Sequence, residues 1–407
     1  MPVLRPSGSD FTSFVKAAAQ YVPPGRSAKV SKSGGVPVAL PGLGAIIRTS
    51  QVGALASPTT SAVIINGITP LAVVAAAVIR VLLGIVTTLA GSGTPAFADG
   101  TGTGASFYYP FGLAVLPDGN IVVADTYNNR IRLITPAGVV TTLAGSNAGY
   151  GDGTGTGPTA SFFQPQGVAV IPSNNVIVVA DTANNRIRRV TYPGGVVTTL
   201  AGGNAAFADG TGEGARFSGP HGVAVTSTGV IVVADTDNHR IRLVTQAGVV
   251  TTLAGSGSPA FANGTGAAAS FNAPRGVAIT STGDIVVADN LNHRIRLVTL
   301  AGVVTTLAGS GSPAFADGTG AGASFNYPAG VAITSSGVIV VAEQDNHRIR
   351  LVTQAGVVTT LAGSGSGAFA DGTGAAASFQ YPRGVAVTST GDVVVADTAN
   401  NRIRLIA

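Results

Sequence analysis

The amino-acid sequence predicts an all-β fold that is built from six copies of one structural unit. The hexapeptide VTTLAG occurs six times in the 407 residues, beginning at positions 86, 140, 197, 250, 304 and 358. An acidic residue that follows Val-Ala recurs at positions 125, 181, 235, 289, 343 and 397, with one spacing of 56 residues and four of 54. Runs rich in Val and Ile alternate with Gly, Ser, Thr, Asn and Asp, which is typical of short strands joined by turns.

Each repeat contains four β-type runs, which we name strands a, b, c and d in chain order. In the third repeat they are residues 222–225, 230–235, 240–245 and 249–254. Four antiparallel strands at a fixed period are typical of a propeller blade, because radial closure protects the edges of the sheets. The sequence therefore predicts a six-bladed β-propeller of four-stranded antiparallel blades.

The two ends of the repeat region are complementary. The last repeat stops after strand c, where a further VTTLAG would begin, whereas the first VTTLAG has no Arg-Ile-Arg segment before it. We therefore predict that residues 85–91 form the outer strand of the C-terminal blade. This N-terminal strand would close the ring, and the propeller would cover residues 85–407.

Residues 1–84 form a basic, low-complexity leader. They contain three Lys and four Arg against one Asp, whereas residues 85–407 contain 16 Arg and no Lys against 17 acidic residues. The positive charge of the chain therefore belongs to the leader and gives no support to nucleic-acid binding by the repeats. The composition of residues 1–60 favours a disordered tail, with an organellar transit peptide as the alternative.

An apolar segment, residues 62–83, ends the leader. Its pattern favours a decayed repeat or an extra edge strand, and a membrane anchor is the alternative because its charged residues are so few. The chain contains no Cys, which excludes disulfides and leaves the redox compartment open. We favour a secreted, membrane-anchored or organellar location over a cytoplasmic one.

The repeat GVAVxxxGxIVVADTxNxRIRLVTxxGVVTTLAG resembles the NHL repeats of six-bladed β-propellers, and six copies cover residues 85–407. This resemblance implies that strand a of each blade lines a central channel. The family includes protein-binding, RNA-binding and ligand-sensing domains as well as some enzymes. The resemblance therefore implies a fold more than it implies a function.

Positions at which nearly identical repeats differ are the candidate binding residues. The d-to-a loops and the b-to-c turns should emerge on one face, and we expect binding there because these connections are the longest and most varied. Drift between the repeats is the alternative explanation of the variation. At the channel mouth the candidates are Tyr109, Phe111, Gln166, His221, Arg275, Tyr327, Tyr381 and Arg383, and at the outer rim they are Tyr127, Asp237, Leu291 and Asp345.

Residues that recur in most or all repeats are expected to be structural. We expect the Asn of the b-to-c turn, Asn128 and its equivalents, to adopt the left-handed conformation of a tight turn. The Asp at the end of strand b should pair with the Arg that opens strand c. Two aromatic residues ten positions apart, such as Phe97 and Phe107, should anchor each d-to-a loop.

Two recurrent sets resemble metal ligands, but a structural role is favoured for both. The loop aspartates, such as Asp99, supply one carboxylate per loop, which is too few for calcium, so we assign them to Asp-Gly turns. His239, His293 and His347 occupy one slot in three consecutive repeats, which would lie too far apart to share a zinc ion. We therefore expect no metal and no other cofactor.

The leading functional hypothesis is a non-enzymatic, monomeric propeller that binds a protein segment or a small ligand at the channel mouth. The sequence has no G-x-S-x-G motif, no H-E-x-x-H motif and no Cys nucleophile. A lyase or hydrolase that uses His221 and Asp237 is the alternative. Binding of single-stranded RNA through Arg275 and Arg383 is a third hypothesis, which the absence of Lys from the repeats makes unfavourable.

Overall fold

The computed structural model describes residues 84–153 and 160–407, together with the backbone of two short segments near the N-terminus. In those segments β1 (Pro37–Ala39) pairs with β2 (Ile46–Arg48) in antiparallel orientation. The predictions for the rest of the leader, including its apolar segment 62–83, lie outside the described residues. Among the residues that are described, no helix is long and apolar enough to cross a membrane.

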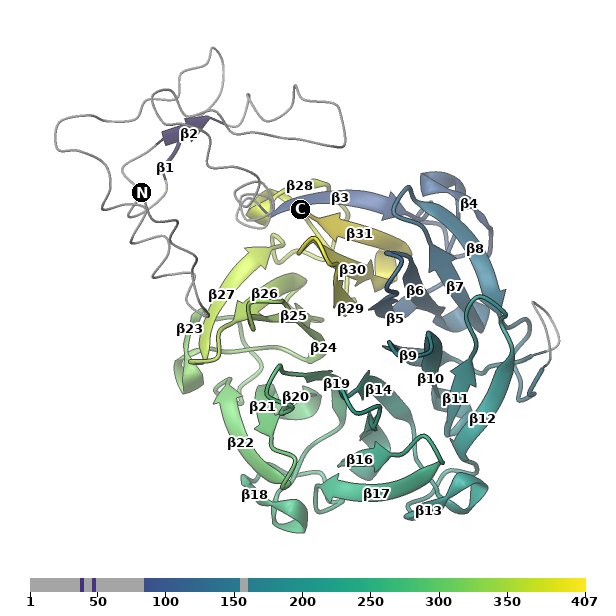
Figure 1. Ribbon diagram of the computed structural model, residues 1–407. Coiled ribbons are helices and arrows are strands. Elements are labelled where there is room, and N and C mark those ends of the chain that lie inside the picture. The colour runs from purple at the N-terminus through teal and green to yellow at the C-terminus, as the bar shows by residue number, and fades with distance from the viewer. Residues whose placement is uncertain (1–36, 40–45, 49–83, 154–159) are drawn as a thin grey trace, which may run out of the picture. The chain divides into compact units, whose positions relative to one another are not determined.

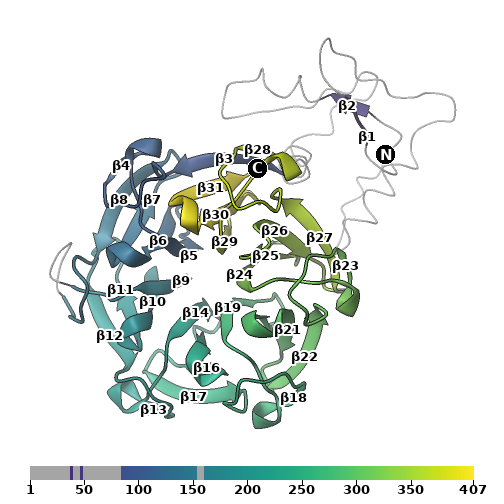
Figure 2. The same cartoon turned by 180° about the vertical axis from the view of Figure 1, so that it is seen from behind.

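Six antiparallel sheets are arranged as blades around a central axis, which confirms the predicted six-bladed β-propeller (Figures 1 and 2). The first blade runs outward from β5 (Pro110–Val115) through β6 (Ile121–Asp125) and β7 (Arg130–Ile134) to β8 (Val139–Ala144). A two-residue strand, β4 (Gly100–Thr101), adds to its outer edge. This fifth strand, which belongs to the preceding d-to-a loop, was not predicted from the sequence.

The other blades repeat this order from the axis outward. Blade 2 consists of β9 (Pro165–Ile171), β10 (Val176–Asp181), β11 (Arg186–Val190) and β12 (Val197–Gly202). Blade 3 consists of β14 (Pro220–Val225), β15 (Ile231–Asp235), β16 (Arg240–Val244), β17 (Val249–Ala254) and β13 (Gly210–Thr211). Blade 4 consists of β19 (Pro274–Ile279), β20 (Ile285–Asp289), β21 (Arg294–Val298), β22 (Val303–Ala308) and β18 (Gly264–Thr265). Blade 5 consists of β24 (Pro328–Ile333), β25 (Ile339–Glu343), β26 (Arg348–Val352), β27 (Val357–Ala362) and β23 (Gly318–Thr319).

The sixth blade joins the two ends of the repeat region, as predicted. It consists of β29 (Pro382–Val387), β30 (Val393–Asp397), β31 (Arg402–Ile406), β3 (Ile85–Ala90) and β28 (Gly372–Thr373). Strand β3 pairs with β31 in antiparallel orientation, with Val86 opposite Ile406. The N-terminal strand therefore closes the ring beside the C-terminus (Figure 1).

The hydrophobic core lies between neighbouring blades. The second strand of each blade is buried along its whole length, apart from Val176 at the start of β10, and its side chains point alternately into the two flanking interfaces. One interface, for example, contains Val232 of blade 3 and Val287 of blade 4. This arrangement explains why strand b reads as a continuous apolar run and does not alternate with polar residues.

The inner strands approach one another closely because each begins with Pro-X-Gly. A Cβ atom added to Gly384 would lie 1.8 Å from the carbonyl oxygen of Phe111 in the next blade, and one added to Gly112 would lie 2.1 Å from that of Gln166. Only glycine permits such contact between the strands. Residue X of each blade is therefore held in a tight ring around the axis.

Candidate functional site

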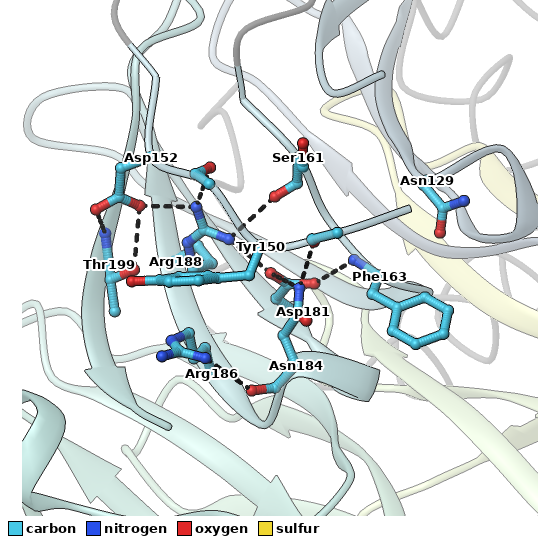
Figure 3. Close-up of polar contacts among 12 residues, drawn as sticks. Asn129, Tyr150, Asp152, Ser161, Phe163, Asp181, Asn184, Arg186, Arg188 and Thr199 are labelled. Atoms are coloured by element: carbon cyan, nitrogen blue, oxygen red, sulfur yellow. Dashed lines mark hydrogen bonds and ion pairs between the residues drawn. The ribbon is translucent and has the colours of Figure 1, made fainter. Parts of the chain in front are cut away.

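An acidic side chain at the end of strand b and an Arg of strand c form a buried ion pair in every blade. Figure 3 shows the pair in blade 2, where an oxygen of Asp181 lies 2.6 Å from Arg188 Nη1 and both side chains are fully buried. Burial raises the pKa of Asp181, and the charge of Arg188 opposes that increase. The pair organises the turn that follows strand b, since Asp181 also accepts hydrogen bonds from Asn184 Nδ2 and the Phe163 amide.

The prediction that the first Arg of strand c would pair with this Asp was wrong. Arg186 is opposite Asp181 in the strand register, but its guanidinium instead stacks on Tyr150, 3.6 Å from the ring centroid. The ion pair is made by the second Arg, Arg188, because that side chain reaches the interior where the carboxylate needs a charged donor.

The loop aspartates belong to the same framework, which corrects their assignment to turn chemistry. Asp152 lies 2.7 Å from Arg188 Nη2 and also accepts a hydrogen bond from the Thr199 hydroxyl (Figure 3). Blade 4 has Asn263 in this place, and its Oδ1 accepts from Arg296 Nη2 at 2.9 Å. The carboxylates are therefore ligands of an arginine, and five of the six blades use them.

The two aromatic residues of each d-to-a loop enclose this buried guanidinium. Arg132 Cζ lies 4.8 Å from the ring centroid of Phe97 and 5.3 Å from that of Phe107. Phe107 is fully buried, whereas Phe97 is 45% exposed. The predicted anchoring role therefore includes cation–π contact with the framework arginines.

The b-to-c turns connect each blade to the next. The left-handed residue is not Asn128, as predicted, but its neighbour Asn129, with φ of 55°. Asn129 Oδ1 accepts a hydrogen bond of 2.9 Å from the Gln164 amide of the following blade. Asn128 instead uses its Nδ2 to hold Asp125, because the buried carboxylate needs a further donor.

Three of these six interblade bonds are accepted by histidine. Nδ1 of His239, His293 and His347 accepts from a backbone amide of the next blade at distances of 3.1, 3.2 and 3.2 Å, respectively. Burial lowers the pKa of all three imidazoles, which favours the neutral, accepting form. The three rings lie in different blades, and no cluster of three potential metal ligands occurs among the described residues.

A second interblade bond is missing from blade 5. The Thr126 hydroxyl donates to the Pro165 carbonyl of the next blade at 2.8 Å, and Thr or Asn makes the same bond in four other blades. Blade 5 has Gln344 at this position. Its side chain accepts a 3.0 Å hydrogen bond from Arg275 Nη1 and donates one of 2.8 Å to Asp345.

The structure gathers five of the predicted mouth residues around a cavity of about 90 Å³ on the propeller axis. Each is the X residue of a Pro-X-Gly segment, and the five are Phe111, Gln166, His221, Arg275 and Arg383. Ala329 is the X residue of the remaining blade and also lines the cavity. Arg383 Cζ lies 4.4 Å from the ring centroid of Phe111. Burial and the neighbouring Arg275 lower the pKa of Arg383 to about 10. Burial and both arginines also hold the pKa of His221 well below its ordinary value.

The three predicted mouth tyrosines do not line this cavity. Tyr109, Tyr327 and Tyr381 have positive φ angles of 51°, 51° and 49°, and their amides donate the interblade bonds described above. The ring of Tyr327 lies edge-on to His293, with 4.9 Å between the ring centroids. Tyr109 stacks on Tyr127 at 5.1 Å. These tyrosines therefore belong to the face around the cavity.

The remaining rim positions differ in what they contact. Leu291 and Tyr127 are 41% and 43% exposed. Burial raises the pKa of Asp237, while Asp345 contacts Gln344 and attracts both mouth arginines. Gln344 was not among the residues predicted from the sequence, although it stands at a position that Thr or Asn occupies in every other blade. In the described structure, His221 and Asp237 form no hydrogen bond with each other.

Comparisons with known proteins agree with this architecture. The NHL repeat matches residues 107–132, 162–190, 217–242, 271–296, 325–350 and 379–404. The chain is 30% identical over 282 residues to Protein SUPPRESSOR OF QUENCHING 1, chloroplastic, of Arabidopsis thaliana, covering 64% of this chain and 26% of that protein. It is also 30% identical over 331 residues to NHL repeat-containing protein 2 of Bos taurus, covering 70% of this chain and 44% of that protein.

The chain thus spans less than half the length of these two relatives. Among solved structures, an auxiliary nutrient binding protein from Bacteroides thetaiotaomicron matches with a TM-score of 0.62 at 16% identity, covering 79% of this chain and 76% of that one. At this identity the match shows a shared fold. The six matched repeats and the closed ring of six blades identify the chain as an NHL-repeat β-propeller protein.

Proposed function

We propose that the propeller is a non-enzymatic recognition module that binds a protein segment or a small ligand at the channel mouth and on the loop-rich face around it. The observation that carries this proposal is a contrast between two kinds of residue. Those that recur in every blade hold the blades together, whereas those that differ between blades converge on one cavity. The similarity to NHL-repeat relatives supports the more general role of an interaction scaffold, without a particular ligand or binding site.

Hydrogen bonding distinguishes the framework arginines from Arg383 at the mouth. The framework Arg188 is paired with two carboxylates, although its Nε has no partner. In the described structure, no side-chain nitrogen of Arg383 makes a hydrogen bond or an ion pair, and the buried Gln166 Oε1 also has no partner. Buried polar atoms are normally satisfied by protein or water, so this set favours the binding of a polar ligand.

The tyrosines around the cavity supply a surface suited to recognition. Tyr381 and Tyr127 are 40% and 43% exposed. Aromatic side chains of this kind combine apolar area with a hydroxyl group and dominate the binding energy of many interfaces. A protein segment could therefore contact these rings while one of its groups enters the channel.

The same geometry gives less support to the two alternatives. A general base at His221 would need a partner to orient it, and Asp237 does not bond to it in the described structure. Residues 85–407 contain no Lys and one more acidic than basic residue, which is unfavourable for a phosphate backbone.

Selection of ligands followed by mapping tests the proposal. The full chain is screened against a displayed random-peptide library and, by thermal shift, against a panel of small metabolites. Tyr327→Ala and Tyr381→Ala are the mouth-face variants, because Ala273 occupies the equivalent position of blade 4. Leu300→Ala is the control, since Leu300 is 59% exposed in a c-to-d turn on the opposite face.

We expect the tyrosine variants to lose at least about tenfold in affinity for the selected ligands and the control to keep it. Ligands that lose affinity only in Leu300→Ala would refute the proposal. So would a set of ligands whose affinity none of these variants changes.

A further inference from the structure

Two arginines flank the smallest residue of the mouth ring. Arg275 lies in blade 4 and Arg383 in blade 6, and the blade between them contributes Ala329. The main-chain contacts follow the same order, since a Cβ on Gly276 would meet the Ala329 carbonyl and one on Gly330 would meet that of Arg383. The smallest residue of the ring thus stands between the two arginines, and all three line the cavity.

Arg383 is held by stacking on an aromatic ring. Its guanidinium lies 4.4 Å from the centroid of Phe111 in the adjacent blade. Stacking covers a face of the guanidinium plane and leaves the N–H groups on its edge able to donate. In the part of the chain that the structure describes, no acceptor binds the terminal N–H groups of Arg383, whereas the framework Arg188 is bound there by two carboxylates. The buried Nε of Arg383 also has no partner, as in the framework arginines.

Arg275 is held in a different way, by Gln344, a residue that departs from the repeat pattern. Its Nη1 donates to Gln344 Oε1 at 3.0 Å. Every other blade has Thr or Asn in place of Gln344 and bonds the next blade with it. Blade 5 thus loses one interblade bond and places a neutral acceptor on a mouth arginine.

The rim carboxylates do not neutralise the two guanidinium groups by direct contact. Asp345 attracts both arginines and Asp237 attracts Arg275, yet neither carboxylate forms an ion pair with them in the described structure. Burial lowers the pKa of Arg275 as well as that of Arg383. The inner ring is therefore positive, and the carboxylates lie farther out.

We infer that the channel mouth is a carboxylate-binding site, in which a ligand carboxylate takes the free edge of Arg383 and replaces Gln344 as the acceptor on Arg275. This inference rests on the proposed recognition function and names the chemical group recognised. A carboxylate is planar and matches the fork of a guanidinium, and it is small enough for a cavity of about 90 Å³. The rim aspartates oppose a doubly charged phosphate more strongly than a single negative charge.

Binding of small probes to the full chain tests this inference. Acetylated Gly-Gly-Ala with a free C-terminus, the same peptide as its C-terminal amide, N-acetylglycine and inorganic phosphate are titrated by calorimetry and ligand-observed NMR. The two peptides differ only in the carboxylate. N-acetylglycine distinguishes a small acid from a peptide C-terminus as the source of that group.

The repeats themselves supply matched variants. Arg383→Gln introduces the residue that blade 2 carries at this place, Gln166, and Gln344→Thr introduces the residue found in four other blades. Arg189→Gln removes one positive charge elsewhere, where the guanidinium contacts Gln246 in a c-to-d turn. Thermal unfolding of each variant shows that it is folded before binding is measured.

We expect the free-carboxylate peptide to bind and its amide to bind at least about tenfold more weakly. Arg383→Gln should lower affinity by a similar factor, Arg189→Gln should leave it unchanged, and Gln344→Thr should raise it because Arg275 no longer has a resident acceptor. Equal binding of the two peptides, preference for phosphate, or no binding of any carboxylate at 10 mM, roughly the limit of weak recognition, would overturn the inference.

Failure of the inference and failure of the proposed function give different results. If carboxylates do not bind but the selected ligands still depend on Tyr327 and Tyr381, the mouth face recognises another chemical group. If carboxylates bind through Arg383 while the selected ligands ignore the mouth face, the recognition function is refuted and only a small-anion site is left.

Discussion

The histidines of the b-to-c turns should make one half of the ring sensitive to acid. Three consecutive blade junctions use His239, His293 and His347 as hydrogen-bond acceptors, and the other three use Asn129, Asn185 and Asn401. An imidazolium ion has no acceptor, whereas an amide oxygen accepts at any pH between 5 and 8. Replacing the three histidines by Asn therefore converts the acid-sensitive junctions to the other kind that the chain already uses.

The sign of the effect follows from proton binding. Burial lowers the pKa of each histidine in the folded state below the ordinary value of 6.5. Below that pH the unfolded chain binds more protons than the folded chain, so the free energy of unfolding falls as the pH falls. The contribution of these histidines is complete above about pH 6.5 and is lost as the pH approaches their lower folded-state values.

The electrostatic neighbours modify but do not reverse this direction. Arg240, Arg294 and Arg348 each lower the pKa of the adjacent histidine further, whereas Asp237 and Asp345 partly oppose the decrease. The buried carboxylates of the framework have raised pKa values and titrate with the opposite effect on stability. They are the same in the wild type and the variant, so they cancel in the difference.

The expected magnitude comes from the hydrogen bonds. Each contributes about 1 kcal/mol to stability, so the three together amount to about 3 kcal/mol when all the imidazoles are protonated. The edge contacts of two histidines with Tyr327 and Tyr381 are lost in the variant at every pH, at a cost of about 0.5–1.5 kcal/mol each. The triple variant should thus be about 1–3 kcal/mol less stable than the wild type at pH 7.5 and lose much less stability on acidification.

Urea unfolding of the full chain, followed by tyrosine fluorescence, measures this difference. Measurements at about pH 7.5, 6.5, 5.5 and 5.0 begin above the ordinary histidine pKa and end below it. The triple variant Asn129→Asp, Asn185→Asp and Asn401→Asp is not a suitable control, because it adds three carboxylates. A better control is Leu300→Ala, an exposed turn residue whose replacement leaves every titratable group in place and should keep the pH dependence of the wild type. Equal pH dependence of the wild type and the triple Asn variant would refute the reasoning.

Two further predictions concern the framework. Deletion of residues 1–83 should leave a folded propeller, whereas deletion of residues 1–91 removes β3 and should lower the midpoint of thermal unfolding markedly. The reason is that β31 then loses its pairing with β3 in the last blade. Equal midpoints of the two deletion variants would contradict ring closure by β3. Asn263→Asp supplies the loop carboxylate that only blade 4 lacks and should stabilise the protein by about 0.5 kcal/mol, as measured by urea unfolding in low salt. The expected gain is small because the equivalent carboxylates of the other blades are solvent-accessible. Loss of stability in that variant would show that Arg296, whose pKa burial lowers, does not gain from a second anion.

The sequence by itself determined the architecture. The fixed period, the Val-rich strands and the complementary ends predicted six blades and the closing strand, because strand and turn preferences are local and repeat exactly as the chain repeats. The variable X positions also predicted which side chains meet at the channel, since a ring of equivalent positions brings them together whatever their identity.

Only the tertiary structure decided how individual side chains are used. Arg186 and Arg188 have the same strand periodicity, and their roles differ because only one reaches the buried carboxylate. The left-handed conformation at Asn129 and the contact between Gln344 and Arg275 depend on the neighbouring blades. Such interactions join residues far apart in the sequence, so a local pattern can propose the participants but cannot choose the partners.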